Sequence, residues 1–327
     1  MKTNKGAILC GVILSAVLLF SGCENHDEIA DQVKDSVKAA TKDIQTNVKE
    51  ATKDIGDELK EVGADIGEGV GDIVVGTGNL IKNSVIGEGS WDGGGRYTIK
   101  GETNCDLSEC EAKDLNVSVD VGDIKVSTSN KDQVSIHAAF KASAKDKEIA
   151  QEIINNADIE SVIENGVLKI RVVKKGTDKD YYEYLKDHYA FFSSTCNFNS
   201  DIEVEIPKSF ETFYVSADVG DITMNDLTGY VNAGTDVGDI EGEKLMLADG
   251  SSITTDVGDV QISLGAPVEK GSADIATNVG NIEIDVNGQE NEVKKSSNDV
   301  VGESLTVTVA GNYEIKADTD VGNVKVE

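Results

Sequence analysis

The carboxylates of a phrase that occurs six times are the residues whose type and spacing could do chemistry. The phrase reads Asp-Val-Gly-Asp-Ile from Asp120, and its copies begin at residues 218, 236, 256, 278 and 320. If the copies stack, each acidic position becomes a row with a spacing of about 4.8 Å, the distance between neighbouring strands. Carboxylates that close repel one another unless water or a cation lies between them. The rows therefore make calcium binding a candidate chemistry.

The alternative interpretation is that these side chains shape a turn. Asp and Asn hydrogen-bond nearby backbone and favour turns for that reason. Later copies carry Asn278, Asn281 and Asn323, and Asn keeps the turn chemistry but lacks the charge that a metal ion would need. We therefore expect structural corners and no cofactor, with Ca²⁺ kept as the alternative. The corner residues are Asp120, Gly122, Asp123, Asp218, Gly220, Asp221, Asp236, Gly238, Asp239, Asp256, Gly258, Asp259, Asn278, Gly280, Asn281, Asp320, Gly322 and Asn323.

The residues around the phrase predict two strands that meet at a corner. Apolar or small residues stand three before the first acidic position, one before it, and one after it, where all six copies have Val. This is the period-two alternation of a strand. A Gly follows in every copy and the alternation then resumes out of phase, which indicates a corner with a positive φ or a bulge.

The spacing of the copies predicts a β-solenoid. The last five copies start 18, 20, 22 and 42 residues apart, and a degenerate copy at Asp299 divides the longest interval. Units of about twenty residues that bury their apolar faces on one another form stacked architectures. We expect an all-β domain, a single-stranded β-solenoid, over residues 102–327.

An insertion over about residues 141–200 separates the first two copies. It is expected to contain a helix over 145–157 and a hairpin around Asn165-Gly166. Seven aromatic residues then fall within 181–198. They could form a platform that stacks on a sugar or peptide, or a cap that closes one end of the solenoid, and we expect the cap. The candidate residues are Tyr181, Tyr182, Tyr184, Tyr189, Phe191 and Phe192.

Catalytic motifs are missing from the sequence. The histidines at 26, 137 and 188 share no motif with Cys or Ser, and there is no GxSxG, HExxH or P-loop. A β-helical polysaccharide enzyme would need a strong base beside a carboxylate cluster, and the sequence around Arg171 supplies no such cluster. We therefore expect a protein that is not an enzyme, with the polysaccharide enzyme as the last alternative.

The charge of the chain limits its partners. Its 60 acidic residues against 30 basic ones give a net charge of −30. Such a surface repels phosphate backbones, so nucleic acid is not an expected partner. Cations, basic peptides and neutral glycans are compatible with this charge.

The N-terminus predicts an exported lipoprotein. Residues 1–22 combine Lys2 and Lys5, an apolar run and a small-residue end, which together form a signal peptide. The Phe-Ser-Gly-Cys sequence ending at Cys23 resembles a bacterial lipobox, which implies cleavage before Cys23 and its modification with acyl chains such as palmitate. Ordinary secretion is the alternative. Several acyl chains anchor a protein stably, so we expect an extracytoplasmic, membrane-anchored lipoprotein on the cell surface.

Three further cysteines follow Cys23. An odd number outside the cytoplasm predicts one disulfide and a spare thiol, or none. Cys105 and Cys110 are close enough in sequence to close a small loop, and Cys196 could compete for either partner. Zinc is not expected, because this pair has no matching second pair.

Residues 23–86 are expected to form the lipid anchor and a helical spacer. Apolar residues recur every eleven positions over 25–73, and eleven residues make three helical turns, so they share one face of an amphipathic helix. The helix could lie on the membrane, self-associate as a stalk, or fold back as a hairpin. We expect the spacer or stalk, because 24–75 has fourteen acidic residues against six lysines. The glycine-rich residues 87–101 predict a linker.

The later part of the chain resembles a known family. Ile202-Glu-Val-Glu-Ile-Pro-Lys leads into Tyr214-Val-Ser-Ala-Asp-Val-Gly-Asp-Ile, then into a Leu227-Thr-Gly turn and Thr235-Asp-Val-Gly-Asp-Ile. This text resembles the bacterial "putative adhesin" domain, a β-strand-repeat family of unknown biochemical function. The resemblance implies a β-solenoid on the cell surface or envelope and no reaction. Some members accompany envelope-stress systems.

These observations favour a non-catalytic surface lipoprotein whose acidic head binds an extracellular or envelope ligand, for example in adhesion. One alternative is an envelope-stress component that captures cationic peptides, with binding that depends steeply on salt. Another is a structural spacer or coat that self-associates through the helix.

Overall fold

The computed structural model describes residues 81–86, 90–91, 96–108, 110–189, 196–265, 270–298 and 302–327. All of them belong to one structural unit, Asp72–Glu327. Several predicted features lie outside the described residues, namely the signal peptide, Cys23, the amphipathic helix over 25–73, Phe191 and Phe192. Among the helices in this described part, none is long and apolar enough to cross a membrane.

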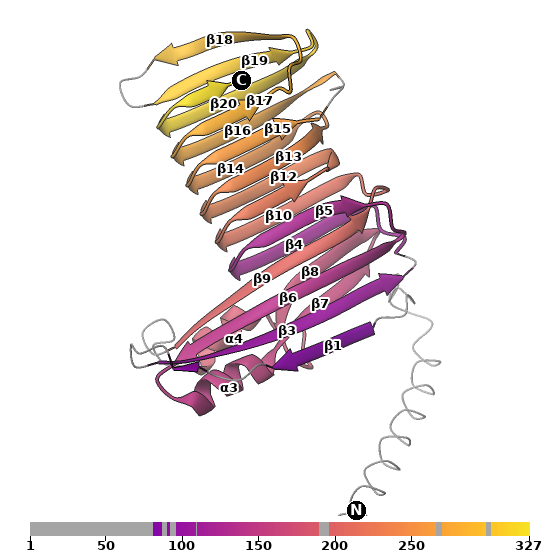
Figure 1. Cartoon of the computed structure of the whole chain (residues 1–327), viewed down its shortest axis with the longest axis vertical. Coiled ribbons are helices and arrows are strands. Elements are labelled where there is room, and N and C mark those ends of the chain that lie inside the picture. The colour runs from indigo at the N-terminus through magenta and orange to yellow at the C-terminus, as the bar shows by residue number, and fades with distance from the viewer. Residues whose placement is uncertain are drawn as a thin grey trace, which may run out of the picture. The chain divides into compact units, whose positions relative to one another are not determined.

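Six stacked rungs form the centre of this unit, each with one strand before the corner and one after it (Figure 1). The strands before the corner are β4 (Asp114–Val121), β10 (Thr212–Val219), β12 (Thr228–Val237), β14 (Ser251–Val257), β16 (Gly271–Val279) and β20 (Tyr313–Val321). The strands after it are β5 (Ile124–Ser129), β11 (Ile222–Asn225), β13 (Ile240–Leu247), β15 (Val260–Leu264), β17 (Ile282–Asp285) and β21 (Val324–Val326).

Each of the two sets of strands pairs in parallel, so equivalent residues of successive rungs are direct neighbours. Val215 of β10, for example, lies opposite both Val117 of β4 and Ala233 of β12. The same holds after the corner, where Ile222 lies opposite Ile124 and Ile240. The mostly β-strand architecture expected from the sequence is confirmed.

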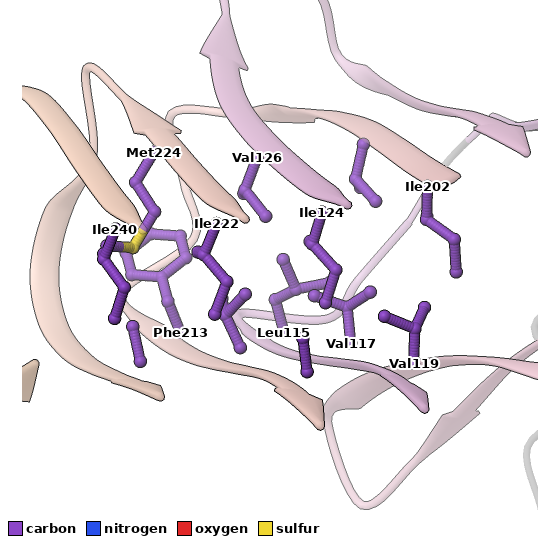
Figure 2. Close-up of a cluster of buried hydrophobic side chains, with 14 of the residues drawn as sticks. Leu115, Val117, Val119, Ile124, Val126, Ile202, Phe213, Ile222, Met224 and Ile240 are labelled. Carbon is purple, nitrogen blue, oxygen red and sulfur yellow. The ribbon is translucent and has the colours of Figure 1, made fainter. Parts of the chain in front are cut away.

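An apolar core lies between the two sheets. Strand alternation directs Leu115 and Val117 of β4 inward, toward Ile124 beyond the corner and Phe213 of the next rung (Figure 2). All four side chains are buried. Burial of one such side chain contributes about 1.5–3 kcal/mol, so apolar contact with its neighbours is the main stabilisation of each rung.

Antiparallel strands build the end of the stack next to β5. β9 (Cys196–Pro207) pairs in parallel with β5 and antiparallel with β6 (Gln133–Ala144), which pairs antiparallel with β3 (Tyr97–Ser108). The outermost strands are β1 (Ile81–Ile86) and β2 (Ser90–Trp91), which both pair with β3.

The positions of β1 and β3 correct the expected boundaries of the spacer and linker. Residues 81–86, which lie within the expected helical spacer, form a strand, and β3 begins at Tyr97, inside the expected linker 87–101. The local sequence of β1 does not specify a strand by itself. Its antiparallel pairing with β3 determines that this segment is a strand.

The insertion extends the sheet of β4 and adds two helices. The hairpin of β7 (Ala157–Glu164) and β8 (Val167–Lys174) turns at Asn165 and Gly166, which both have positive φ, and β8 pairs in parallel with β4. Helix α3 (Lys147–Asn156) packs on β3 and β6, while α4 (Tyr181–His188) packs on β8. Helix α3 and the hairpin lie where the sequence predicted them, and α4 was not predicted.

A hairpin also covers the other end of one sheet. β18 (Asn291–Asn298) and β19 (Glu303–Val309) are antiparallel, and β19 pairs antiparallel with β20. Strand β16 pairs directly with β20, with Val279 opposite Val321. The expectation of a degenerate rung at Asp299 is therefore wrong. In that segment Gly follows Asp by three residues instead of two, so the corner geometry of the phrase is not encoded there.

Candidate functional site

The second acidic position of the phrase joins successive rungs. The Oδ1 atom of Asp221 accepts a hydrogen bond from the backbone N–H of Asp239 at 2.8 Å, and Asp239 accepts one from Asp259 at 2.8 Å. Further bonds of this kind run from Asp221 to Asp123, from Asn281 to Asp259 and from Asn323 to Asn281. The sequence suggested that these side chains shape a turn within one rung. In the structure they instead accept hydrogen bonds from the next rung. An Asn oxygen accepts the same bond, which explains why Asn replaces Asp.

The Gly of each copy closes the corner against the neighbouring rung. These glycines have φ between +142° and +158°, a region that residues with a side chain rarely adopt. A Cβ on Gly238 would lie 2.0 Å from the carbonyl oxygen of Gly220, and one on Gly258 would lie 1.9 Å from that of Gly238. The corner therefore requires Gly for two independent reasons. The six are Gly122, Gly220, Gly238, Gly258, Gly280 and Gly322.

A buried threonine row adds a third link between rungs, which the sequence analysis missed. In four copies the residue before the first acidic position is a buried Thr whose hydroxyl donates to the carbonyl oxygen of the preceding corner Gly at 2.9–3.0 Å. The signal was the repeated Thr in an otherwise apolar position. These residues are Thr235, Thr255, Thr277 and Thr319.

The valine of the phrase faces solvent, which corrects the expectation that it shares the inward face of the strand. Five of these valines are each 45–47% exposed, namely Val219, Val237, Val257, Val279 and Val321. The strand alternation ends at the residue before the first acidic position. Because Val is the last residue before the Gly, its side chain lies on the outer side of the bend.

The first acidic position also lies on this outer side. Asp218, Asp236, Asp256 and Asp320 are exposed, and the Nδ2 of Asn278 donates to Oδ1 of Asp256 at 3.1 Å. Within the described ranges, no group of three or more His, Cys, Asp or Glu side chains is arranged to hold a metal ion. The geometry of the corners therefore gives the calcium alternative no support.

A pocket of about 220 Å³ opens where the first acidic row begins. Its walls carry the carboxylates of Asp120, Asp180 and Asp218 and the ring of Tyr182. Asp180 is the N-cap of α4 and accepts a hydrogen bond from the backbone N–H of Glu183 at 2.8 Å, so the helix holds it at the pocket. Desolvation, followed by the charges of Asp180 and Asp218, raises the pKa of Asp120 to about 6. The pocket favours a positively charged group.

Replacing Asp120 by Asn should stabilise the protein at alkaline pH. The carboxyl has a higher pKa in the folded chain than in the unfolded chain, so the folded state loses stability as pH rises from about 4 to about 6. The side chain is half-buried, and solvent screening reduces the expected gain to about 1 kcal/mol. Urea unfolding measured at pH 4 and pH 8 tests this difference.

The matched control is Asp236→Asn, at the same position of an exposed rung. It removes one carboxylate from the same row at a position outside the pocket, so it reports the effect of the substitution itself. If Asp120→Asn changes the free energy of unfolding by the same amount at pH 4 and pH 8, the raised pKa of Asp120 is contradicted.

Among the described aromatic residues of the insertion, Tyr181 and Phe198 are buried and the other rings are half-buried. Tyr181 is buried, its hydroxyl donates to the carbonyl oxygen of Ile153 in α3, and its ring meets that of Phe198 edge-on with centroids 4.9 Å apart. Burial raises the pKa of Tyr181. Tyr184 stacks on Tyr181 with centroids 5.8 Å apart. Tyr181 therefore belongs to the core and could not contact a ligand.

The other tyrosines of α4 lie at the surface beside cations. The Nζ atom of Lys174 is 4.3 Å from the ring centroid of Tyr184, and that of Lys186 is 4.6 Å from the centroid of Tyr182. Tyr189, which follows the helix, is also half-buried. These three rings are the part of the expected aromatic platform that a ligand could reach in the described structure.

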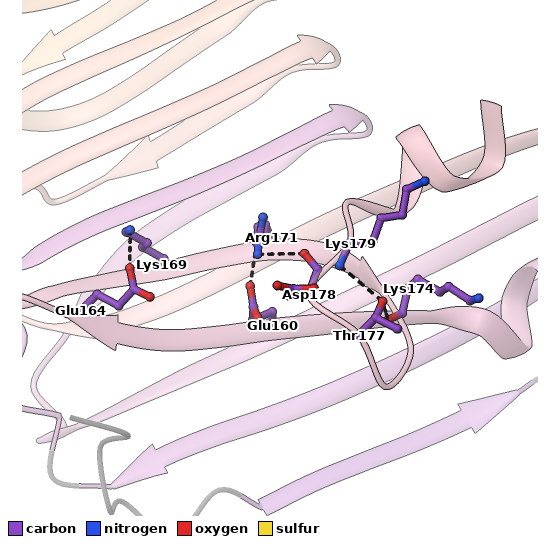
Figure 3. A network of polar contacts seen from close by, with 8 residues as sticks. All are labelled: Glu160, Glu164, Lys169, Arg171, Lys174, Thr177, Asp178 and Lys179. Atoms are coloured by element: carbon purple, nitrogen blue, oxygen red, sulfur yellow. Dashed lines mark hydrogen bonds and ion pairs between the residues drawn. The ribbon is translucent and has the colours of Figure 1, made fainter. Parts of the chain in front are cut away.

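Arg171 is engaged by its own hairpin. Its Nε donates to Glu160 Oε2 of the paired strand at 2.6 Å, and a terminal guanidinium nitrogen donates to the carbonyl oxygen of Asp178 at 3.0 Å (Figure 3). Lys169 and Glu164 form a second ion pair across the same strands at 2.6 Å. These contacts hold the hairpin and its following loop together.

The sequence leaves open one disulfide or none, and the structure forms none between Cys105 and Cys110. Cys105 is buried in β3, with its Sγ 3.4 Å from Ser161 Oγ, whereas Cys110 lies beyond the end of the strand and is half-buried. Cys196 is buried in β9 and, among the described residues, also forms no disulfide. The reason is that pairing with β1 and β6 fixes Cys105 in an extended strand, so the small loop cannot close.

Comparison with known proteins gives one family and several solved structures. A family model described as Toastrack DUF4097 matches residues 102–327. A structure described as a "putative cell adhesion protein" from Clostridium sporogenes is 10% identical, with 69% of this chain and 97% of that chain covered and a TM-score of 0.32. A "putative adhesin" from Bacteroides fragilis is 12% identical with the same coverage and a TM-score of 0.29. No curated protein gives a match.

Proposed function

Because the chain belongs to the Toastrack DUF4097 family over residues 102–327, we propose that it is a non-catalytic, cell-surface lipoprotein whose β-solenoid head binds an extracellular or envelope ligand. Adhesion is one role that such binding would serve. The N-terminal signal and Cys23 support the lipid anchor, since they combine an apolar export segment with a lipobox-like cysteine.

The observation that carries this proposal is the set of rows along the rung corners. Carboxylates and valines repeat there at the spacing of neighbouring strands. Their side chains face solvent and do not belong to the apolar core. Exposed, aligned side chains of this kind suit the recognition of an extended ligand better than the conversion of a small substrate.

Binding of the full chain to a panel of glycans, matrix proteins and cationic peptides, each at low and high salt, tests the proposal. We expect at least one class to bind saturably. Salt-resistant binding to a glycan or matrix protein would support adhesion. No binding to any class would overturn the ligand-binding function and leave the structural spacer.

Capture of cationic peptides is a second candidate function. Two acidic rows on one corner and a net charge of −30 favour it. Binding limited to cationic peptides and weakened steeply by salt would support this candidate over adhesion.

A further inference from the structure

We propose that the rung corner is a docking surface for a cationic amphipathic α-helix that lies along the stack. The valine corner is defined as Val219, Val237, Val257, Val279 and Val321 together with the acidic positions on either side of each. The inference rests on the proposed ligand-binding function and assigns to it a surface and a partner conformation.

The valine of this corner does not vary between copies, and it is exposed in five of the six. All six copies have Val there, whereas the position one after the corner Ile or Val, which is exposed or half-buried, differs between rungs. That position holds Lys125, Thr223, Glu241, Gln261, Glu283 and Lys325. Core packing does not explain the valines, because nearly half of each side chain contacts solvent. Strand propensity does not explain them either, since Thr is also β-branched and would suit an exposed strand end.

Acidic positions also lie on both sides of the valines. The first acidic row is exposed, and the second row has one carboxylate oxygen held by a backbone N–H of the next rung, which fixes the other oxygen at the surface. Both rows carry Asp from Asp218 to Asp259 and become partly Asn beyond that point. An apolar line between two anionic lines is complementary to an apolar helix stripe flanked by Lys or Arg.

The repeat distance along the stack is close to the pitch of an α-helix. Rungs repeat every 4.7–4.9 Å or so, as paired strands do, and an α-helix turns once in about 5.4 Å. The two repeats differ by about 2.4 Å over the four intervals between Val219 and Val321, which is less than one helical turn. An extended peptide presents one face every ~6.7 Å and loses register within two rungs. The corner therefore matches a helix of three to four turns, or roughly 13 residues.

Charge also decides between possible occupants. A second copy of the chain would bring its own acidic rows against these, and the amphipathic segment 24–75 has fourteen acidic residues against six lysines. Both would be repelled. A separate cationic helix is the occupant that the surface favours.

The test uses the full chain and an 18-residue Leu/Lys peptide with a single apolar stripe. The comparison peptide has the same composition in a shuffled order that gives no stripe. We expect the striped peptide to bind at least ~10-fold more tightly and to become helical by circular dichroism on binding. The triple variant Val219→Thr, Val237→Thr, Val257→Thr should lose about tenfold in affinity, because Thr keeps the shape and removes apolar contact.

Charge and folding are controlled separately. The variant Asp218→Asn, Asp236→Asn, Asp256→Asn should weaken binding and flatten its salt dependence, and the chain itself places Asn at this position in Asn278. Unchanged melting temperatures show that each variant is folded. Equal binding of striped and shuffled peptides, or an unchanged affinity of the Thr variant, would overturn the docking surface. If glycans or matrix proteins still bind, the proposed function survives that result, and if nothing binds, both fail.

Discussion

Replacing Gly238 by Ala should lower the free energy of unfolding by about 3 kcal/mol, because it combines backbone strain with a steric clash. The residue has φ of +152°, and a Cβ would lie 2.0 Å from the carbonyl oxygen of Gly220, a backbone atom that cannot move without opening the rung. Chemical denaturation of the purified chain measures the loss.

A suitable control for Gly238→Ala is Gly250→Ala. Gly250 also has a positive φ, of +80°, but its nearest atom to an added Cβ is 3.8 Å away on the ring of Tyr230. It therefore reports the cost of the backbone conformation alone, about 1 kcal/mol. If the two variants lose equal stability, the contact between rungs contributes nothing, and the explanation given for the corner Gly fails.

The Tyr181→Ser variant should lower the free energy of unfolding by about 4 kcal/mol, as large-to-small changes of buried aromatic residues do. The change removes a buried ring that contacts Phe198 and leaves the carbonyl oxygen of Ile153 without its donor. Thermal and urea unfolding give the measurement. This result is expected if the insertion caps the stack.

Tyr184→Ser is the matched control, since Tyr184 is on the same helix but half-buried. We expect it to cost less than about 1.5 kcal/mol, and Tyr181→Phe, which removes only the hydroxyl, about 1 kcal/mol. A Tyr181→Ser variant that melts with the wild type would show that the ring does not stabilise the end of the stack, and would return it to the candidates for ligand contact.

The stack itself could be predicted because its determinants are local and repeated. The interval between copies fixes the length of a rung, and the Gly after each Val marks the corner, so the parallel neighbours followed from the alignment of the copies. The links between rungs were less visible. Whether Asp239 bonds its own turn or the next rung depends on a backbone twenty residues away, which no local pattern reports.

The candidate surface could be predicted only in part, for a different reason. A prediction from strand alternation assumes a straight strand and therefore directs Val219 toward the core. The chain bends at Gly220, and Val219 lies on the solvent side of that bend. The pocket at Asp120 was missed because Asp180 reaches it from α4, sixty residues along the chain, and the helix was not expected. The segment at Asp299 was mistaken for a rung corner because its residues resemble the repeated phrase. Its Gly, however, follows the Asp by three residues instead of two.

The hairpin of β18 and β19 has a consequence for how the protein behaves at high concentration. A parallel stack ends in a strand with unpaired backbone groups, which can recruit the same strand of another molecule and grow into a fibre. β19 covers the open side of β20 with an antiparallel strand, and β18 then presents Glu292 and Lys294 to solvent as an irregular, charged margin. In the other sheet, the final strand β21 is only three residues long. The repeat can thus lengthen within one chain by copying units, while this C-terminal end discourages polymerisation between chains.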